Sequence, residues 1–144
     1  MISRSATHAL RALAVLAALP PGTSLDTGQL AARVDAPPNY LGKLLQILRR
    51  TGILASRKGL GGGFSLARPA AELTLYEIVE PLEGLDRWNG CFLGQEICSA
   101  ETACPVHDDW GRIRDRYLGF LRETRLAALA GTARIPGGIS DPTP

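Results

Sequence analysis

Three cysteines and one histidine form the densest group of reactive side chains in this 144-residue chain. Cys91, Cys98 and Cys104 are its only cysteines, separated by six and then five residues, and His107 follows three positions later. Thiolates and imidazoles bind zinc and iron–sulfur clusters. Structural zinc sites usually use more closely spaced cysteine pairs, so this spacing favours a loop around a larger cluster. The alternative is a zinc-stabilised structural or interaction module. The simplest interpretation is that the three loop cysteines bind no ligand.

A helix is predicted to start close to the third cysteine. Pro105 suits the first helical position, and Asp108 and Asp109 suit the positive end of a helix dipole. In such a helix Cys104 and His107 share one face, and the N-terminus stabilises a thiolate. An odd number of cysteines, with no secretion signal, argues against a disulfide framework.

The C-terminal part of the chain has the pattern of a long amphipathic helix over residues 105–130. The apolar residues of its stripe are Trp110, Ile113, Tyr117, Phe120, Leu121 and Leu129. The stripe either packs in the core or forms the seam of a dimer, and we favour the seam. The following residues, 131–144, are predicted to be a disordered tail.

The N-terminal half is predicted to hold three helices and a hairpin. Residues 4–19 are interrupted by His8 and Arg11, which favours an amphipathic helix over a signal peptide. Helices near 27–34 and 38–50 around a tight turn form a helix-turn-helix. A β-hairpin is predicted next, with "ILAS" as its first strand, "RKGLGGG" as its turn and "FSLAR" as its second strand. The following stretch, "LTLYEIVEPLEG", is predicted to be a helix capped at Thr74. No apolar run is long enough for a membrane span.

The glycine-rich turn does not fit a nucleotide-binding loop. A Walker loop ends in Gly-Lys-Ser/Thr, but here Gly63 is followed by Phe64. A dinucleotide-binding fingerprint needs a glycine or alanine at the position of Phe64 and a helix after it, but here a strand is predicted to follow. A basic hairpin directly after a helix-turn-helix is typical of a winged helix. No nucleophile–base pair or carboxylate dyad accompanies it, so we predict a protein that is not an enzyme and has no small-molecule substrate.

Charge is distributed unevenly along the chain despite a net charge of only +2. Residues 33–68 carry seven Lys or Arg against one acidic residue, and residues 69–109 carry nine acidic residues against one arginine. A basic block of that density is typical of a surface that binds a polyanion. Judged by charge alone, these basic residues could equally form a solvent-exposed face that binds nothing.

These motifs together resemble the IscR/NsrR-type winged-helix regulators, the Rrf-two family. The resemblance rests on "YLGKLLQILRRTGILASRKGLGGGFSLAR", "LTLYEIVEPLEG" and the cysteine loop, and it covers about residues 1–130. It implies a cytoplasmic, homodimeric transcription factor that binds double-stranded operator DNA. Many members hold a [2Fe–2S] or [4Fe–4S] cluster and sense iron–sulfur status, nitric oxide or oxidation with it.

The resemblance also assigns roles to individual residues. Cys91, Cys98 and Cys104 correspond to the cluster cysteines and His107 to a histidine ligand, with His8 of a partner chain as a minor alternative. The exposed positions of the recognition helix correspond to Asn39, Tyr40 and Lys43, and the basic contacts of the wing to Arg57 and Lys58.

The expected fold class is mainly α with a small β-hairpin: a winged helix-turn-helix followed by a long C-terminal dimerisation helix. The expected organisation is a DNA-binding domain (1–84), a cluster-binding loop (85–104), a dimerisation helix (105–130) and a tail (131–144). The expected function is a transcriptional regulator, either a repressor or an activator, that senses iron–sulfur status, redox state or nitric oxide through an iron–sulfur cluster.

Overall fold

The computed structural model describes residues 2–95, 99–101 and 103–130; the predicted tail and Cys98 lie outside these residues. Seven helical segments and a two-stranded antiparallel hairpin make up this part of the chain, which confirms the predicted fold class. In order they are α1 (Arg4–Ala17), α2 (Thr27–Val34), α3 (Pro38–Arg50), β1 (Leu54–Arg57), β2 (Gly63–Leu66), α4 (Leu75–Glu83), the 3₁₀ helix η1 (Leu85–Asn89), α5 (His107–Glu123) and α6 (Ala127–Ala130).

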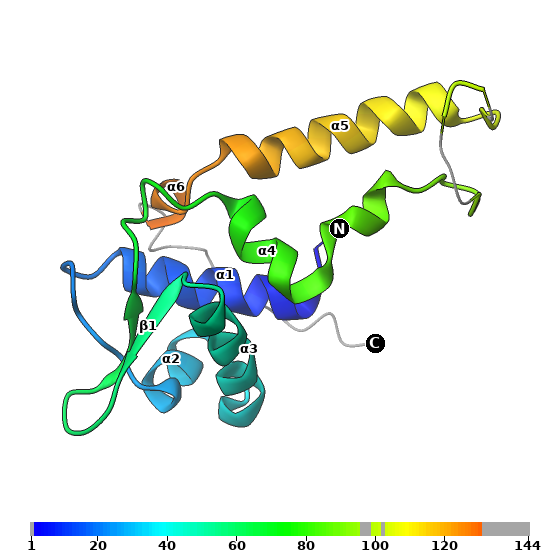
Figure 1. Ribbon diagram of the computed structural model, residues 1–144. Coiled ribbons are helices and arrows are strands. Elements are labelled where there is room, and N and C mark those ends of the chain that lie inside the picture. Colours follow the sequence, from blue (N-terminus) through cyan, green and yellow to red (C-terminus); the bar gives the residue numbers. More distant parts are fainter. Residues whose placement is uncertain (1, 96–98, 102, 131–144) are drawn as a thin grey trace.

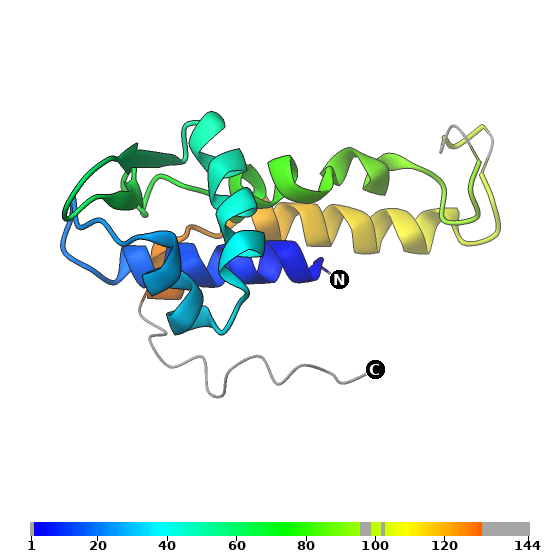
Figure 2. The same ribbon diagram turned by 90° about the horizontal axis from the view of Figure 1, so that it is seen from below.

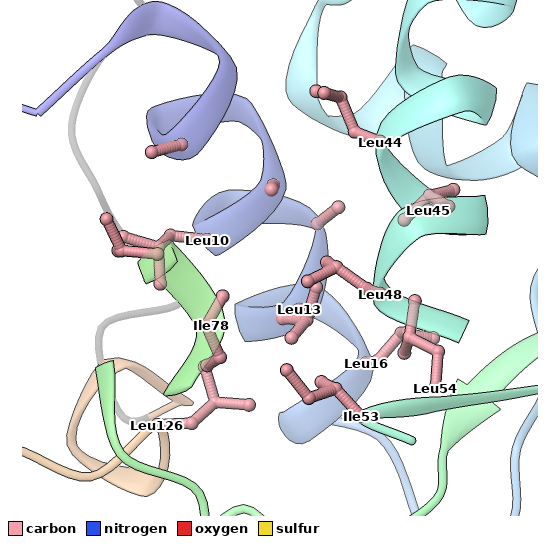
Figure 3. Packing of buried hydrophobic residues seen from close by; sticks show 14 of the residues in the cluster. Leu10, Leu13, Leu16, Leu44, Leu45, Leu48, Ile53, Leu54, Ile78 and Leu126 are labelled. Atoms are coloured by element: carbon pink, nitrogen blue, oxygen red, sulfur yellow. The ribbon is translucent and has the colours of Figure 1, made fainter. Parts of the chain in front are cut away.

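Residues 2–84 form a winged-helix body around the central helix α1 (Figure 1). Apolar residues of α1 face α3 on one side and α4 with the 126–130 segment on the other (Figure 3). Leu13, Leu45 and Ile78 are fully buried where these elements meet. The periodic leucines of α1 and α3 therefore bury one face of each helix, as their spacing predicts.

Local capping residues fix where the helices of the body begin. Asp26 caps α2 and Thr74 caps α4, each through a reciprocal capping box with a side chain three residues later. Asp35 takes a left-handed conformation between α2 and α3, with φ of 54°, which makes the turn of the helix-turn-helix tight. The structure confirms α2, α3, the hairpin and the Thr74 cap at their expected places, while α1 ends at Ala17, two residues early.

The predicted single helix over 105–130 is wrong in two places. It begins only at His107, after a turn that the His107 N–H closes on the Cys104 carbonyl at 3.0 Å. It ends at Glu123 because the next residues pair with the body: the Leu75 N–H donates to the Thr124 carbonyl, and the Leu126 N–H donates to the Leu73 carbonyl at 2.8 Å. Burial of Leu126 in the core therefore outweighs continuation of the helix.

The segment from η1 to α5 forms an arm that leaves the body (residues 85–123). Figures 1 and 2 both show α5 extending from the body, with the cysteine loop beyond its far end. Only the C-terminal half of α5 is anchored, through the buried residues Leu118 and Leu121. Among the described helices, none has the length and apolarity needed to cross a lipid bilayer.

Candidate nucleic-acid interface and cysteine loop

Helix α3 separates a buried leucine face from a polar outer face. Leu41, Leu44, Leu45 and Leu48 lie inward. The outer face and the start of α2 line a shallow groove formed by Thr27, Pro38, Asn39, Gly42, Lys43, Gln46, Ile47 and Arg50. Asn39 and Lys43 are both exposed there, which is where a helix entering a major groove presents its side chains.

Tyr40 is turned toward the body rather than fully exposed. Its hydroxyl lies 2.6 Å from Ser5 Oγ, and its ring meets the His8 ring edge-on at 5.8 Å between centroids. The resemblance implied an exposed position, and the structure corrects this to a half-buried one. The physical reason is the helical period, which places residue 40 beside the inward-facing Leu41 and Leu44. Tyr40 thereby holds the start of α3 against α1.

His8 is a core residue of this chain. It is only 4% exposed, and its Nδ1 makes no hydrogen bond to any residue that the structure describes. Burial lowers the pKa of His8, and the neighbouring charges of Arg4 and Arg11 lower it further. The neutral imidazole therefore fills space between α1 and Tyr40.

The hairpin places two exposed basic residues directly before its turn. Arg57 ends β1 opposite Gly63, and Lys58 follows it. Gly63, with φ of +133°, lies against residue 25, and any Cβ there would collide with the Leu25 carbonyl. That close approach lets Leu25 and Phe64 exchange two backbone hydrogen bonds, of 2.7 and 3.0 Å. The glycine therefore lets the wing bond directly to the residues just before α2.

The structure brings the first and third cysteines together. Cys91 and Cys104 are half-buried and their side chains share a hydrogen bond. The pKa of the Cys91 thiol lies below its usual range because the backbone N–H groups of Gln95 and Leu93 donate to the sulfur. His107 is half-buried one turn after Cys104. The Cys91 sulfur is thus placed in surroundings that favour the thiolate.

The remaining predicted ligand, Cys98, lies outside the described residues. Within residues 2–95, 99–101 and 103–130, no three or more His, Cys, Asp or Glu side chains are placed to hold a metal ion. The described part of the chain therefore shows one pair of the predicted cysteine ligands in contact.

A cluster of aromatic rings attaches the cysteine loop to α5. Trp88 stacks on Trp110 at 5.6 Å and contacts Tyr117 at 4.9 Å, while Phe92 meets Trp110 at 5.5 Å. The Trp110 Nε1–H donates to the Gly90 carbonyl at 3.0 Å. Sequence reasoning missed Trp88 and Phe92, although both tryptophans of the chain flank the cysteines. The rings hold both ends of the loop side by side.

The apolar stripe predicted on α5 divides into two faces. Leu121 is buried against the body together with Leu118, which the predicted stripe did not include, whereas Ile113 and Phe120 are 59% and 54% exposed. The sequence pattern predicts one continuous surface because a helical period alone does not show which side of the helix meets the body. Ile113 and Phe120 are seven residues apart, so they lie on the same side of the helix.

The chain matches proteins of one family over most of its length. Residues 2–132 match Rrf2, described as "Iron-dependent Transcriptional regulator". A putative HTH-type transcriptional regulator of Mycobacterium tuberculosis is 34% identical over 133 residues, covering 92% of this chain and 82% of that protein. IscR of Photorhabdus laumondii is 30% identical over 97 residues, covering 67% of this chain and 58% of that protein.

A solved structure shows the same architecture. The global cysteine regulator CymR of Bacillus subtilis superposes with a TM-score of 0.77 at 26% identity, over 91% of this chain and 96% of that one. The fold, the family match and relatives named as regulators agree with the basic helix-turn-helix and wing, and they confirm the prediction that the protein is not an enzyme. The chain belongs to the Rrf2 family of winged-helix transcriptional regulators.

Proposed function

We propose that this chain is a cytoplasmic, homodimeric DNA-binding regulator that senses iron–sulfur status, redox state or nitric oxide through an iron–sulfur cluster held by the cysteine loop. The observation that carries the proposal is the contact between Cys91 and Cys104. Two sulfurs from distant positions meet at the end of the arm, where nothing in the core of the body requires them. IscR proteins among the relatives support the same assignment.

The chemistry of the donor set fits such a cluster. Backbone N–H groups stabilise the Cys91 thiolate, and thiolates are the usual ligands of [2Fe–2S] and [4Fe–4S] clusters. In the proposal, Cys98 is the third thiolate ligand and His107 is the fourth ligand. A bound cluster would supply one-electron redox chemistry and reactivity toward oxygen and nitric oxide.

The attachment of the loop supports a route from sensor to DNA. Its first end continues into η1, where Leu85 is buried and its N–H donates to Glu80 Oε2 of α4 at 2.6 Å. Its second end continues into α5. A change in the loop would therefore act on α4 and α5 together and shift the population of body arrangements that fit an operator.

Exposed apolar residues on α5 support the dimer. Ile113 and Phe120 face away from the body, and a large exposed apolar patch commonly marks an interface. Two copies joined through α5 would present two helix-turn-helix units to two half-sites of an operator. In this proposal Asn39 and Lys43 contact base edges, Arg57 and Lys58 contact phosphates, and Tyr40 mainly positions α3.

The test is anaerobic purification followed by visible absorption spectroscopy and counts of iron and acid-labile sulfide, repeated after exposure to oxygen and to nitric oxide. We expect coloured protein whose spectrum changes on exposure. Cys98→Ala should be colourless yet folded and dimeric, because the body has its own core. Thr102→Ala, in the same loop, is the matched control and should keep its iron. Unchanged iron in Cys98→Ala would contradict the assignment, and colourless wild-type protein that retains zinc would favour the zinc-stabilised alternative.

Cysteine regulation is a second candidate function, favoured by the similarity to CymR. If the protein regulates cysteine metabolism instead, it should be free of iron even when it is purified anaerobically. Its DNA binding should then not respond to nitric oxide. The iron count therefore separates it from the proposed function.

A further inference from the structure

The tip of the wing carries a large apolar side chain that the fold does not use. Leu60 is fully exposed, whereas the other large apolar residues of the hairpin pack inward, with Leu54 2% and Phe64 6% exposed. Replacing Leu60 by a small residue would not reduce the apolar surface that is buried in the body. A requirement outside the chain therefore explains Leu60 better than packing does.

The turn holds Leu60 in a defined place. Gly59 and Gly61 on either side have φ of +92° and +72°, and the Gly62 N–H donates to the Gly59 carbonyl at 3.0 Å. A Cβ at Gly62 would collide with the Arg57 carbonyl, so the turn closes tightly on β1. A rigid turn presents its apex residue at little entropic cost on binding. Figure 1 shows the hairpin extending from the body in the same direction as α3.

The neighbours of Leu60 indicate the kind of surface that it meets. Arg57 and Lys58 are exposed three and two residues before it, and their charges suit phosphates. An apolar tip beside two cations matches the minor groove of DNA, whose rims are phosphates and whose floor is formed by base edges. Over A·T pairs this floor lacks an exocyclic amino group, whereas each G·C pair places the guanine 2-amino donor there.

We propose that Leu60 packs on the minor-groove floor and makes the wing discriminate against G·C pairs at that step. The proposal rests on the proposed winged-helix binding to DNA and adds a specificity-determining residue to it. An apolar side chain over a guanine amino group removes water from a donor and returns no hydrogen bond, which is unfavourable. Over A·T pairs the same side chain buries its own surface without that loss. Leu60 would thus discriminate between A·T and G·C pairs, whereas Arg57 and Lys58 would contact the phosphates of any sequence.

The experiment uses the full-length dimer and duplexes selected from a randomised library by the wild-type protein. We expect the selected sites to contain A·T pairs where the wing docks. Replacing one such pair by G·C should weaken binding on the order of tenfold, because the contact of one leucine side chain is lost. Replacing it by inosine·C, which removes only the 2-amino group, should restore the affinity. Leu60→Ala should bind all three duplexes alike, and Leu60→Met should keep the wild-type preference.

The outcomes separate this proposal from DNA binding itself. If Leu60→Ala keeps the wild-type preference, or if inosine·C binds as weakly as G·C, the minor-groove contact of Leu60 is wrong even though the protein binds DNA. Lys58→Ala reports on the wing as a whole. If that variant keeps both its affinity and its salt dependence in a folded dimer, the wing does not touch DNA, and the larger proposal for the wing fails together with this one.

Discussion

The winged-helix body and the arm are held together in different ways. In the body, helices α1, α3 and α4 share a continuous buried core, with Leu13, Leu45 and Ile78 inaccessible to solvent. In the arm, the free half of α5 and the cysteine loop are held mainly by the stacked rings of Trp88 and Trp110 and their neighbours. The body therefore has a core of its own, whereas the arm leaves exposed apolar side chains and two half-buried thiols outside that core. Elements that respond to a signal come from such weakly anchored parts.

The largest effect is expected when the exposed apolar surface of the arm is removed, because the difference between arm and body depends on it. Ile113→Asp with Phe120→Asp should give monomers, since each carboxylate buried in a seam costs several kcal/mol. Light scattering measures the mass, and circular dichroism should show an intact fold, because both residues are exposed in the single chain. Asp115→Lys, a charge change on the opposite side of α5, is the control and should remain dimeric. A dimer of unaltered mass in the double variant would show that α5 is not the seam.

Matched truncations of one residue in each region should separate their stabilities. Leu45→Ala in the body should lower the free energy of unfolding by about 2–5 kcal/mol, because it leaves a cavity in a fully buried site. Trp88→Ala should cost the body much less but should increase hydrogen exchange in residues 85–95. Denaturant titration and hydrogen exchange with mass spectrometry measure the two effects. Equal global losses would mean that arm and body unfold as one unit.

Two substitutions within the body should distinguish base reading from charge. Asn39→Ala should weaken binding to a selected duplex by about 1–3 kcal/mol with little effect on random DNA, because it removes a base-edge contact. Lys58→Ala should weaken both kinds of DNA and reduce the salt slope by about one contact per protomer. Binding titrations at several salt concentrations measure both. The assignment of roles is refuted if the two variants lose affinity for selected and random DNA in the same ratio.

The smallest expected effect concerns the link between the wing and α4. A hydrogen bond from the Thr74 N–H lowers the pKa of Glu77, and Arg68, at 3.0 Å, and the Thr74 hydroxyl lower it further. The stabilisation is therefore present above the unfolded-state pKa of about 4.3 and is lost as pH falls through the lowered folded-state pKa. Glu77→Gln should cost less than about 1 kcal/mol at neutral pH, because the ion pair is partly exposed. It should also flatten the acid side of the stability profile, measured by thermal unfolding against pH.

Most of the body was predictable because its signals are local. The helical period of 4–19, the cap at Thr74 and the glycines of the hairpin turn each act within a few residues of themselves. The arm was less predictable. The end of α5 at Glu123 depends on backbone bonds to residues 73–75, which are distant in sequence. The contact of Trp88 with Tyr117 likewise has no local pattern.

The amino-acid sequence by itself determined the helix-turn-helix, the wing, the basic surface and the cysteine set, because period, turn chemistry and charge are properties of neighbouring residues. Only the tertiary structure decided which side of α5 meets the body, that Tyr40 packs on Ser5 and His8, and that Cys91 meets Cys104. It also showed that Leu60 is fully exposed in the described part of the chain. These outcomes depend on which surfaces compete for the same core, and that competition is settled only when all the elements are assembled.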